Sequence, residues 1–281
     1  MSMLYFDPVT SDPPEVDGAY PPSYVGVSIP SAGELLHGVA YSAQGAGPHP
    51  VAVFLHGLPG HERNLDLAQA ARRAGWTALT FSYRGAWGSG GQFTFGHALE
   101  DVQAALTWLR TDDARQLLRA DGERVALIGI SMGAWAALMT TAERSDLLGA
   151  AALAPWNVGA YAQLTAKPDV RPMALDFLAA LSRPLQSLGA DALLDELAAH
   201  QTVWDVVQHA AALREQRLLL VAGAEDDEAP PYLHYAPLVK ALHGALLLQH
   251  HQIADADHAF SARRIELARL VIAWLDTLRR A

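Results

Sequence analysis

The chain has 281 residues, of which 51% are hydrophobic and 18% charged, a composition typical of a folded globular protein that excludes the disordered and fibrous classes. The formal net charge is −10 and basic residues gather only in pairs such as Arg72-Arg73, which argues against a nucleic acid or an anionic membrane as partner. Cysteine is absent, which excludes disulfides, thiolate catalysis and metal sites that depend on sulfur.

The first segment of the chain is predicted to be irregular. Residues 1–22 are rich in Pro and Asp and are expected to form an arm on the surface. They lack the basic start and apolar core of a secretory signal, and no apolar run in the chain reaches the roughly 18 residues of a membrane span. We therefore expect a cytoplasmic protein that does not bind a membrane.

Two kinds of segment alternate along the rest of the chain. Six nearly continuous apolar runs are typical of strands buried on both faces: 51–57, 77–83, 124–130, 149–155, 217–223 and 245–251. Before them, two short antiparallel strands are predicted at 24–30 and 34–41. Helical periodicity fills five of the later gaps: 65–74, 99–109, 134–141, 232–242 and 265–278. This alternation predicts an α/β fold with a doubly wound, mostly parallel central sheet of about eight strands.

One gap between predicted strands is far longer than a crossover needs. About sixty residues separate the strands at 149–155 and 217–223, and their pattern is helical and amphipathic. We predict a helical cap insertion at 156–214, with the core formed by 1–155 and 215–281. Three apolar residues of this segment are expected to line the substrate pocket: Trp156, Met173 and Phe177. The alternative is an extra packed helical layer with no role in binding.

The stretch VALIGISMGAWAAL, residues 125–138, contains the pentapeptide G-I-S-M-G between a predicted strand and a predicted helix. In a G-x-S-x-G turn the strand reverses sharply into the helix, and side chains at the two glycine positions would collide with the backbone. The turn holds the serine hydroxyl exposed beside a helix N-terminus, where negative charge is stabilised. Ser131 is therefore the candidate nucleophile.

A serine nucleophile needs a base, usually a histidine that a carboxylate orients. Of the 12 histidines, His258 in the sequence DADHAF lies in a polar loop after the last predicted strand, where its ring can reach the edge of the sheet. Four acids follow the strand at 217–223, and among them Asp226 is preferred over Asp227 as the orienting carboxylate. His250 and His251 with Asp255 and Asp257 are an alternative metal set, but the triad explains His258 without a metal.

The oxyanion of an acyl-transfer reaction needs two hydrogen-bond donors aimed at one point. The amide of Met132 directly follows the nucleophile and would supply one donor. The sequence HGLPG at 56–60 follows the first parallel strand and offers the amide of Leu58 as the second. His56, at the end of that strand, is expected to organise the loop through a hydrogen bond rather than to act as a second base.

Five motifs together resemble the α/β-hydrolase superfamily, over nearly the whole chain: HGLPG, YRGAWGSGG, GISMG, GAEDDEAP and DADHAF. The order Ser, Asp, His is that of the superfamily. The sequence around YRGAWGSGG looks like the single-domain relatives of serine carboxylesterases and of acyl-peptide or prolyl-type peptidases. The resemblance implies that this loop lines the pocket, which makes Trp87 and Phe93 candidate substrate-binding residues.

Two departures from that resemblance favour an esterase over a peptidase. Peptidases of this kind usually carry two glycines after the residue that follows the serine, whereas here Gly133 is followed by Ala134. The propeller domain of the larger peptidases is also missing. The sequence thus predicts a serine hydrolase without metal or cofactor that cleaves small or medium carboxylic esters. A peptidase or amidase with the same triad, or a non-catalytic binding protein on this fold, remains the alternative.

Overall fold

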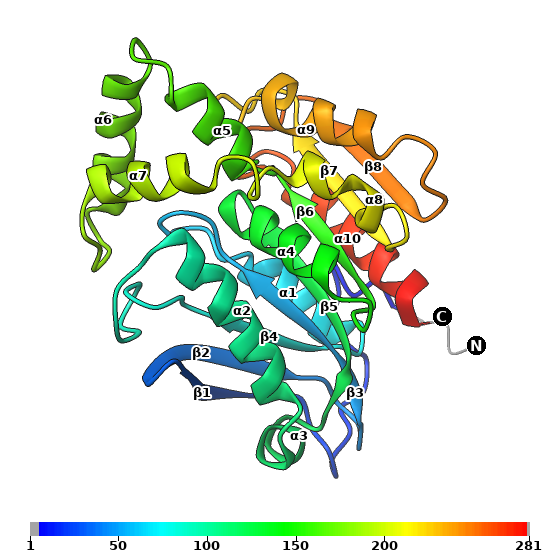
Figure 1. Cartoon of the computed structure of the whole chain (residues 1–281). Helices are drawn as coiled ribbons and strands as arrows, with labels where there is room; N and C mark the ends of the chain where they lie inside the picture. Colours follow the sequence, from blue (N-terminus) through cyan, green and yellow to red (C-terminus); the bar gives the residue numbers. More distant parts are fainter. Residues whose placement is uncertain (1–5, 280–281) are drawn as a thin grey trace.

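In the computed structural model, which describes residues 6–279, eight strands form one sheet in the order β1-β2-β4-β3-β5-β6-β7-β8 (Figure 1). The strands are β1 Ser23–Ser31, β2 Glu34–Ser42, β3 His49–Leu55, β4 Thr77–Phe81, β5 Ala120–Ile130, β6 Gly149–Leu153, β7 Leu218–Gly223 and β8 Leu248–Ile253. The β1–β2 and β2–β4 pairs are antiparallel, and the other five pairs are parallel. The predicted doubly wound, mostly parallel sheet of about eight strands is confirmed.

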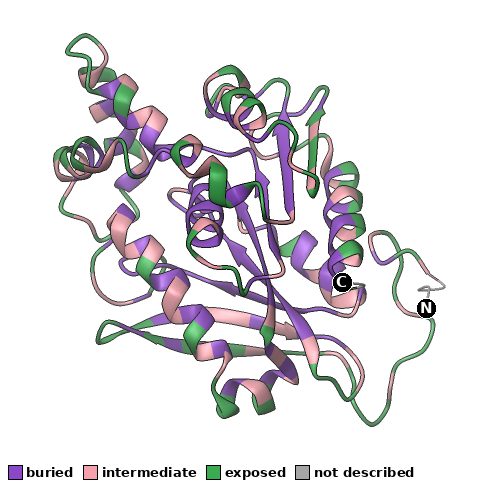
Figure 2. Cartoon of the chain, turned by 45° about the vertical axis from the view of Figure 1, so that its right-hand side comes forward, coloured by how far each residue is buried: buried purple, intermediate pink, exposed green. Residues whose placement is uncertain are grey.

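Helices cover both faces of the sheet, because side chains alternate between the two faces along each buried strand. On one face, Ala52 and Phe54 of β3 pack with α1 (Leu65–Arg73) and α10 (Arg264–Arg279). On the other, Val53 and Leu55 pack with α2 (Phe95–Leu109) and α4 (Met132–Glu143), and α9 (Pro231–Ala241) covers the neighbouring part of that face. Figure 2 shows the central strands buried along their length, with exposed residues on the outer sides of the helices.

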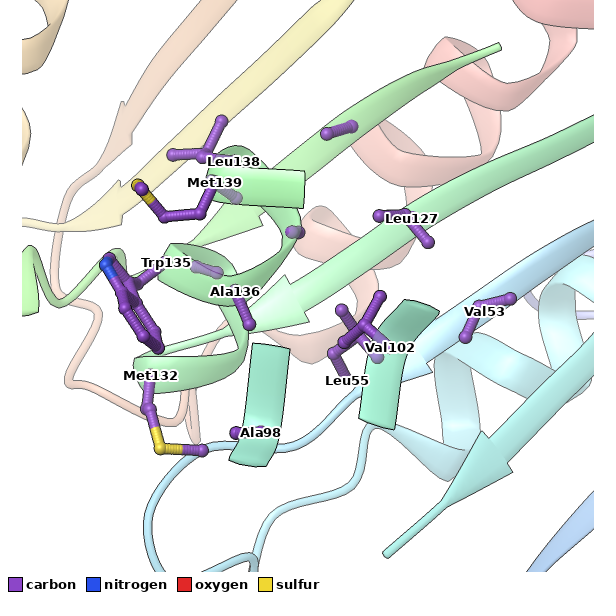
Figure 3. Close-up of a cluster of buried hydrophobic side chains, with 14 of the residues drawn as sticks. Val53, Leu55, Ala98, Val102, Leu127, Met132, Trp135, Ala136, Leu138 and Met139 are labelled. Atoms are coloured by element: carbon purple, nitrogen blue, oxygen red, sulfur yellow. The ribbon is translucent and has the colours of Figure 1, made fainter. Parts of the chain in front are cut away.

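Helix α4 is the most buried of the covering helices. Ten successive residues from Met132 to Thr141 are buried, and Ala136 points toward Leu55 while Trp135 and Met139 point away from it (Figure 3). The ring of Trp135 lies 6.3 Å from that of Phe95 on α2. Small alanine side chains let this helix sit close to the sheet, as its packing against β5 and β6 requires. The residue immediately before α4 therefore has a rigid support.

Strand β8 differs from the prediction. Residues 245–247 belong to the preceding turn, and Leu246 is 95% exposed, so the strand begins at Leu248. Because β8 is the outermost strand of the sheet, it has exposed polar residues, Gln249, His250 and Gln252, rather than a continuous apolar run. The short helix α3 (Asp112–Leu118) was not predicted, since seven residues give too little periodicity to recognise.

The long segment between β6 and β7 forms α5 (Val158–Thr165), α6 (Arg171–Ser182), α7 (Ala190–His200), the 3₁₀ helix η1 (Val206–His209) and α8 (Ala210–Leu213). Helices α5–α7 pack mainly on one another, at the upper left of Figure 1, whereas η1 and α8 pack on α4. We call α5–α7 the insertion. Its α7 also contacts α2, where Glu196 accepts hydrogen bonds from the amides of Phe95 and Gly96, both at 2.9 Å. None of the helices described within 6–279 is both long and apolar enough to cross a membrane.

Candidate active site

The predicted catalytic side chains come from three separate strand ends. Ser131 directly follows β5, Asp226 follows β7, and His258 lies in the loop between β8 and α10. Because β5, β7 and β8 are parallel members of one sheet, their carboxyl ends meet at the same edge. Ser131 and His258 line the same pocket at this edge.

The turn at Ser131 has the tight geometry that its glycines suggested. Ser131 adopts φ 57° and ψ −122°, a conformation that a residue with a side chain rarely adopts. A β-carbon at Gly129 would lie 2.0 Å from the carbonyl oxygen of Gly133, and one at Gly133 would lie 2.1 Å from that of Leu55. Only glycine fits at either position. The backbone of the turn around Ser131 therefore requires glycine at residues 129 and 133.

Ser131 stands at the N-terminus of α4, where the first amides of a helix have no partner within the helix. Its own amide donates to the carbonyl of Leu153 on β6 at 2.9 Å, which ties the turn to the neighbouring strand. The amide of Met132, the first residue of α4, comes directly after Ser131 in the chain. The helix dipole adds partial positive charge at this end, so an anion beside Ser131 is stabilised.

His258 and Asp226 are joined by a hydrogen bond from Nδ1 of the imidazole to Oδ2 of the carboxylate at 2.8 Å. Asp226 is 4% exposed, and its other oxygen accepts from the amides of Glu228 at 3.1 Å and Ala229 at 2.8 Å. Asp227 is exposed. The structure thus brings Asp226, rather than its neighbour, to His258, and leaves Nε2 of the imidazole for another partner.

The surroundings of His258 favour its protonated form. Burial of the imidazole opposes protonation, but the hydrogen bond and charge of Asp226, with further charge from Glu228 and Asp257, outweigh it and raise the pKa of His258 above its usual value. An imidazole in these surroundings is a stronger base than a free one, while the hydrogen bond to Asp226 fixes which nitrogen carries the proton.

The pocket has a volume of about 200 Å³. It is lined by three stretches of backbone and side chain and by two further side chains: residues 57–62, 130–131 and 258–259, with Leu181 and Glu228. The titratable side chains in this lining are two glutamates and two histidines. The space suits a small or medium-sized group next to Ser131, and helix α6 of the insertion contributes to its wall through Leu181.

The loop after β3 carries Leu58, whose amide is the predicted second oxyanion donor. Gly57 and Leu58 line the pocket, and the Leu58 amide has no hydrogen-bond partner among residues 6–279. His56 is 3% exposed and donates from Nδ1 to the carbonyl of Gly57 at 2.7 Å. Burial lowers its pKa to about 4, so the ring is neutral at pH 7. His56 thus makes the loop-organising hydrogen bond that the sequence predicted.

Two of the aromatic residues predicted to bind substrate pack in the core. Phe93 is 1% exposed, and its ring lies 5.7 Å from that of Phe95. Trp156 is 4% exposed, and its ring lies 5.8 Å from the same Phe95 ring. Neither is among the residues that line the pocket at Ser131. This placement differs from the prediction because the space between α2, α4 and the insertion needs large apolar side chains to fill it.

The other three predicted substrate-binding residues are more accessible. Trp87 is 41% exposed and donates from its indole nitrogen to the carbonyl of Pro59 at 2.7 Å. Met173, near the start of α6, is 68% exposed, and Phe177 on the same helix packs against Tyr161 with ring centroids 6.1 Å apart. None of the three lines the pocket at Ser131.

Several residues of the pocket were missed from the sequence. Leu181 stood out only as an apolar residue of an amphipathic helix, and that pattern does not separate a pocket wall from a core contact. Glu228 looked like one acid in a charged loop. His61 and Glu62 directly follow HGLPG, so their place beside the oxyanion loop was the one available signal.

Comparison with known proteins supports the arrangement of strands and turns. A family model described as the alpha/beta hydrolase family matches residues 52–270, which is most of the chain and includes all three strand ends of the site. The chain belongs to the alpha/beta hydrolase family. The matched residues include the Ser131 turn and the Asp226–His258 pair.

Individual relatives are distant. An uncharacterized protein of Rickettsia prowazekii (strain Madrid E) is 29% identical over 113 residues, which cover 38% of this chain and 45% of that protein. The crystal structure of puromycin hydrolase has a TM-score of 0.69 at 19% identity and covers 96% of this chain but 41% of that one. An esterase of Pyrococcus furiosus has a TM-score of 0.64 at 19% identity, covering 95% and 97%. This chain therefore spans less than half of the first two proteins, and the structural likenesses show a shared fold.

Proposed function

We propose that this member of the alpha/beta hydrolase family is a serine hydrolase that cleaves carboxylic esters of small or medium acyl groups. One observation carries the proposal: Ser131, in a strained turn at a helix N-terminus, lines the same pocket as His258, which is hydrogen-bonded to the buried Asp226. These are the nucleophile, base and orienting acid that acyl transfer requires. The chemistry needs no metal or cofactor.

In the proposed reaction, Oγ of Ser131 attacks the ester carbonyl while Nε2 of His258 takes the hydroxyl proton. The carbonyl oxygen becomes an oxyanion, which the amides of Leu58 and Met132 stabilise. When the intermediate collapses, the C–O bond to the alcohol breaks and His258 gives its proton to the leaving oxygen. A water molecule then attacks the acyl group, His258 takes its proton, and Ser131 leaves with that proton as the acid is released.

Asp226 supports both steps without changing its own charge. Its Oδ2 accepts from Nδ1 of His258 and so keeps Nε2 free to act as base. The negative carboxylate also stabilises the imidazolium that forms in each step. Because Asp226 is held by the amides of Glu228 and Ala229, it does not turn away to another partner.

A peptidase or amidase with the same residues is the second candidate, because an acylaminoacyl peptidase of Pyrococcus horikoshii is similar in fold, with a TM-score of 0.66 at 16% identity. The fold match covers 41% of that peptidase and 97% of the similar esterase. Ala134, which stands where such peptidases usually carry a second glycine, favours the ester over the amide.

The test compares hydrolysis of a p-nitrophenyl ester of a short acyl group with that of an aminoacyl anilide, for the wild type and Ser131→Ala. We expect ester hydrolysis and labelling by a fluorophosphonate probe in the wild type, and loss of both in the variant. A faster reaction with the anilide would favour the peptidase. Absence of turnover and of labelling in the folded wild type would favour a non-catalytic binding protein and reject the proposal.

A further inference from the structure

We propose that Trp87 is a positioning residue for the oxyanion loop, residues 57–60, and acts through this loop without touching the substrate. Its indole N–H holds the carbonyl of Pro59, and this bond keeps the adjacent Leu58 amide aimed at the oxyanion. The inference rests on the proposed function. It replaces the substrate-binding role that the sequence suggested for Trp87.

Three carbonyl groups of the oxyanion loop are held by side chains from outside it. His56 donates to the carbonyl of Gly57 at 2.7 Å, Trp87 to that of Pro59 at 2.7 Å, and Nε of Arg63 to that of Gly60 at 3.3 Å. The Leu58 amide lies between the first two and has no partner among the described residues. An amide that is free while its neighbours are fixed is ready to bind an anion at no cost of reorganisation.

Gly60 shows how closely the loop fits between its two aromatic supports. A β-carbon at this position would lie 2.5 Å from Nδ1 of His56 and 2.8 Å from the indole nitrogen of Trp87. The backbone at Gly60 also has φ +103°, which favours glycine. At Gly60 the loop therefore packs directly against both rings, and removing one of them leaves it with room to move.

The backbone of Trp87 is itself in an unusual conformation. Trp87 has φ 49°, a left-handed value that bulky residues rarely adopt. Its ring makes an edge contact with His61 at 5.4 Å, and the Arg63 guanidinium lies 5.4 Å from the ring centroid. Since Trp87 is 41% exposed, its burial stabilises the fold less than the burial of a core tryptophan would. The strained backbone and the exposed ring of Trp87 are both explained by its hydrogen bond to the oxyanion loop.

The segment that carries Trp87 is anchored on both sides. On one side, Ser89 Oγ accepts from the amide of His37 on β2 at 2.9 Å and donates to the carbonyl of Ser82 at 2.8 Å. On the other, Gln186 donates from its amide to the carbonyl of Gly85 at 2.8 Å and accepts from the amide of Phe93 at 2.7 Å. Gln186 lies between α6 and α7, so main-chain hydrogen bonds tie the segment that carries Trp87 to the insertion, and the indole N–H of Trp87 ties it to the oxyanion loop.

The variant Trp87→Phe keeps an aromatic ring but removes the N–H donor, and it tests this inference with a split between kcat and KM. Complete loss of an oxyanion donor costs about 10²–10³ in kcat. A donor that is displaced rather than removed costs less, so we expect kcat for the p-nitrophenyl ester to fall about tenfold while KM stays within about twofold. A boronic acid, whose tetrahedral adduct with Ser131 carries the oxyanion, should bind about tenfold more weakly.

The matched control is Trp108→Phe, since Trp108 lies on α2, packs half-buried against the core and does not line the pocket at Ser131. We expect wild-type kcat and KM for it, and a melting temperature for Trp87→Phe close to that of this control. Unchanged kcat and boronate affinity in Trp87→Phe would overturn the inference. So would a raised KM with unchanged kcat, because that result makes Trp87 a substrate contact. A wild type that neither hydrolyses esters nor reacts with fluorophosphonate rejects the proposed function itself.

Discussion

Gly57 lies so close to Ser131 that a β-carbon at residue 57 would be 2.9 Å from the β-carbon of the serine. The carbonyl of Ile130 would be 3.2 Å away. The oxyanion loop and the turn at Ser131 therefore lie in close contact, and an oxygen bound to the loop amides would lie beside the serine hydroxyl. This approach depends on the missing side chain of a single glycine.

Gly57→Ala should separate the loop from the serine turn. We expect kcat/KM for the ester to fall at least about tenfold and the free energy of unfolding to fall by about 1–3 kcal/mol, because the extra methyl group has no space. Steady-state kinetics and urea unfolding measure the two effects. Gly26→Ala is the control, since a β-carbon there meets nothing within 4 Å. Wild-type activity in Gly57→Ala would contradict the predicted role of the Leu58 amide.

The strain at Ser131 predicts opposite effects on activity and stability. Ser131→Ala and Ser131→Gly both lack the hydroxyl and should both be inactive, but only glycine adopts φ 57° and ψ −122° without strain. We expect Ser131→Gly to be more stable than Ser131→Ala by about 1 kcal/mol in urea unfolding. Equal stability, or a more stable alanine variant, would show that the turn stores no strain.

Asp226 and Asp227 are adjacent in sequence, and their asparagine variants should differ sharply. In Asp226→Asn the remaining oxygen keeps the amides of Glu228 and Ala229, and the new NH₂ group faces Nδ1 of His258, which forces the wrong tautomer. We expect kcat to fall by about 10³–10⁴, with KM little changed. Asp227→Asn changes an exposed side chain and should keep nearly full activity. The reverse pattern would assign the acid to Asp227.

The raised pKa of His258 determines the acidic limb of the pH–rate profile. Only the neutral imidazole acts as base, so kcat/KM should increase as pH rises through the pKa of His258, with a midpoint above the usual value of about 6.5. Glu228→Gln removes one of the charges that raise this pKa, so the limb should move to lower pH. Glu225→Gln, on the same loop, is the control. A limb that shifts upward in Glu228→Gln would refute this assignment.

Glu196 holds the insertion to the core by capping α2. Glu196→Ala leaves the amides of Phe95 and Gly96 without their acceptors, and we expect the free energy of unfolding to fall by about 1–2 kcal/mol. Glu196→Gln keeps one acceptor oxygen without the charge and should lose less. Urea unfolding of the two variants measures the difference. Equal stability of the wild type and both variants would mean that the contact contributes nothing to holding α7.

The local sequence was enough to predict those parts of the molecule whose structure depends on residues adjacent in the chain. Residues 51–55 of β3 and 125–130 of β5 are all buried, so their apolar composition alone predicted these two strands. The turn at Ser131 is likewise contiguous, because strand, glycines and helix lie within one stretch of chain. His258 and Asp226 were predicted from loops after parallel strands, which share one edge of any such sheet.

What only the tertiary structure decided depends on contacts between distant segments. An apolar residue has the same pattern whether it fills the core, as Phe93 does, or lines a pocket, as Leu181 does. The edge position of β8 comes from the strand order, which no local pattern contains. The hydrogen bond from Trp87 to Pro59 joins loops after two different strands, and only folding brings a donor on one loop to a carbonyl on the other.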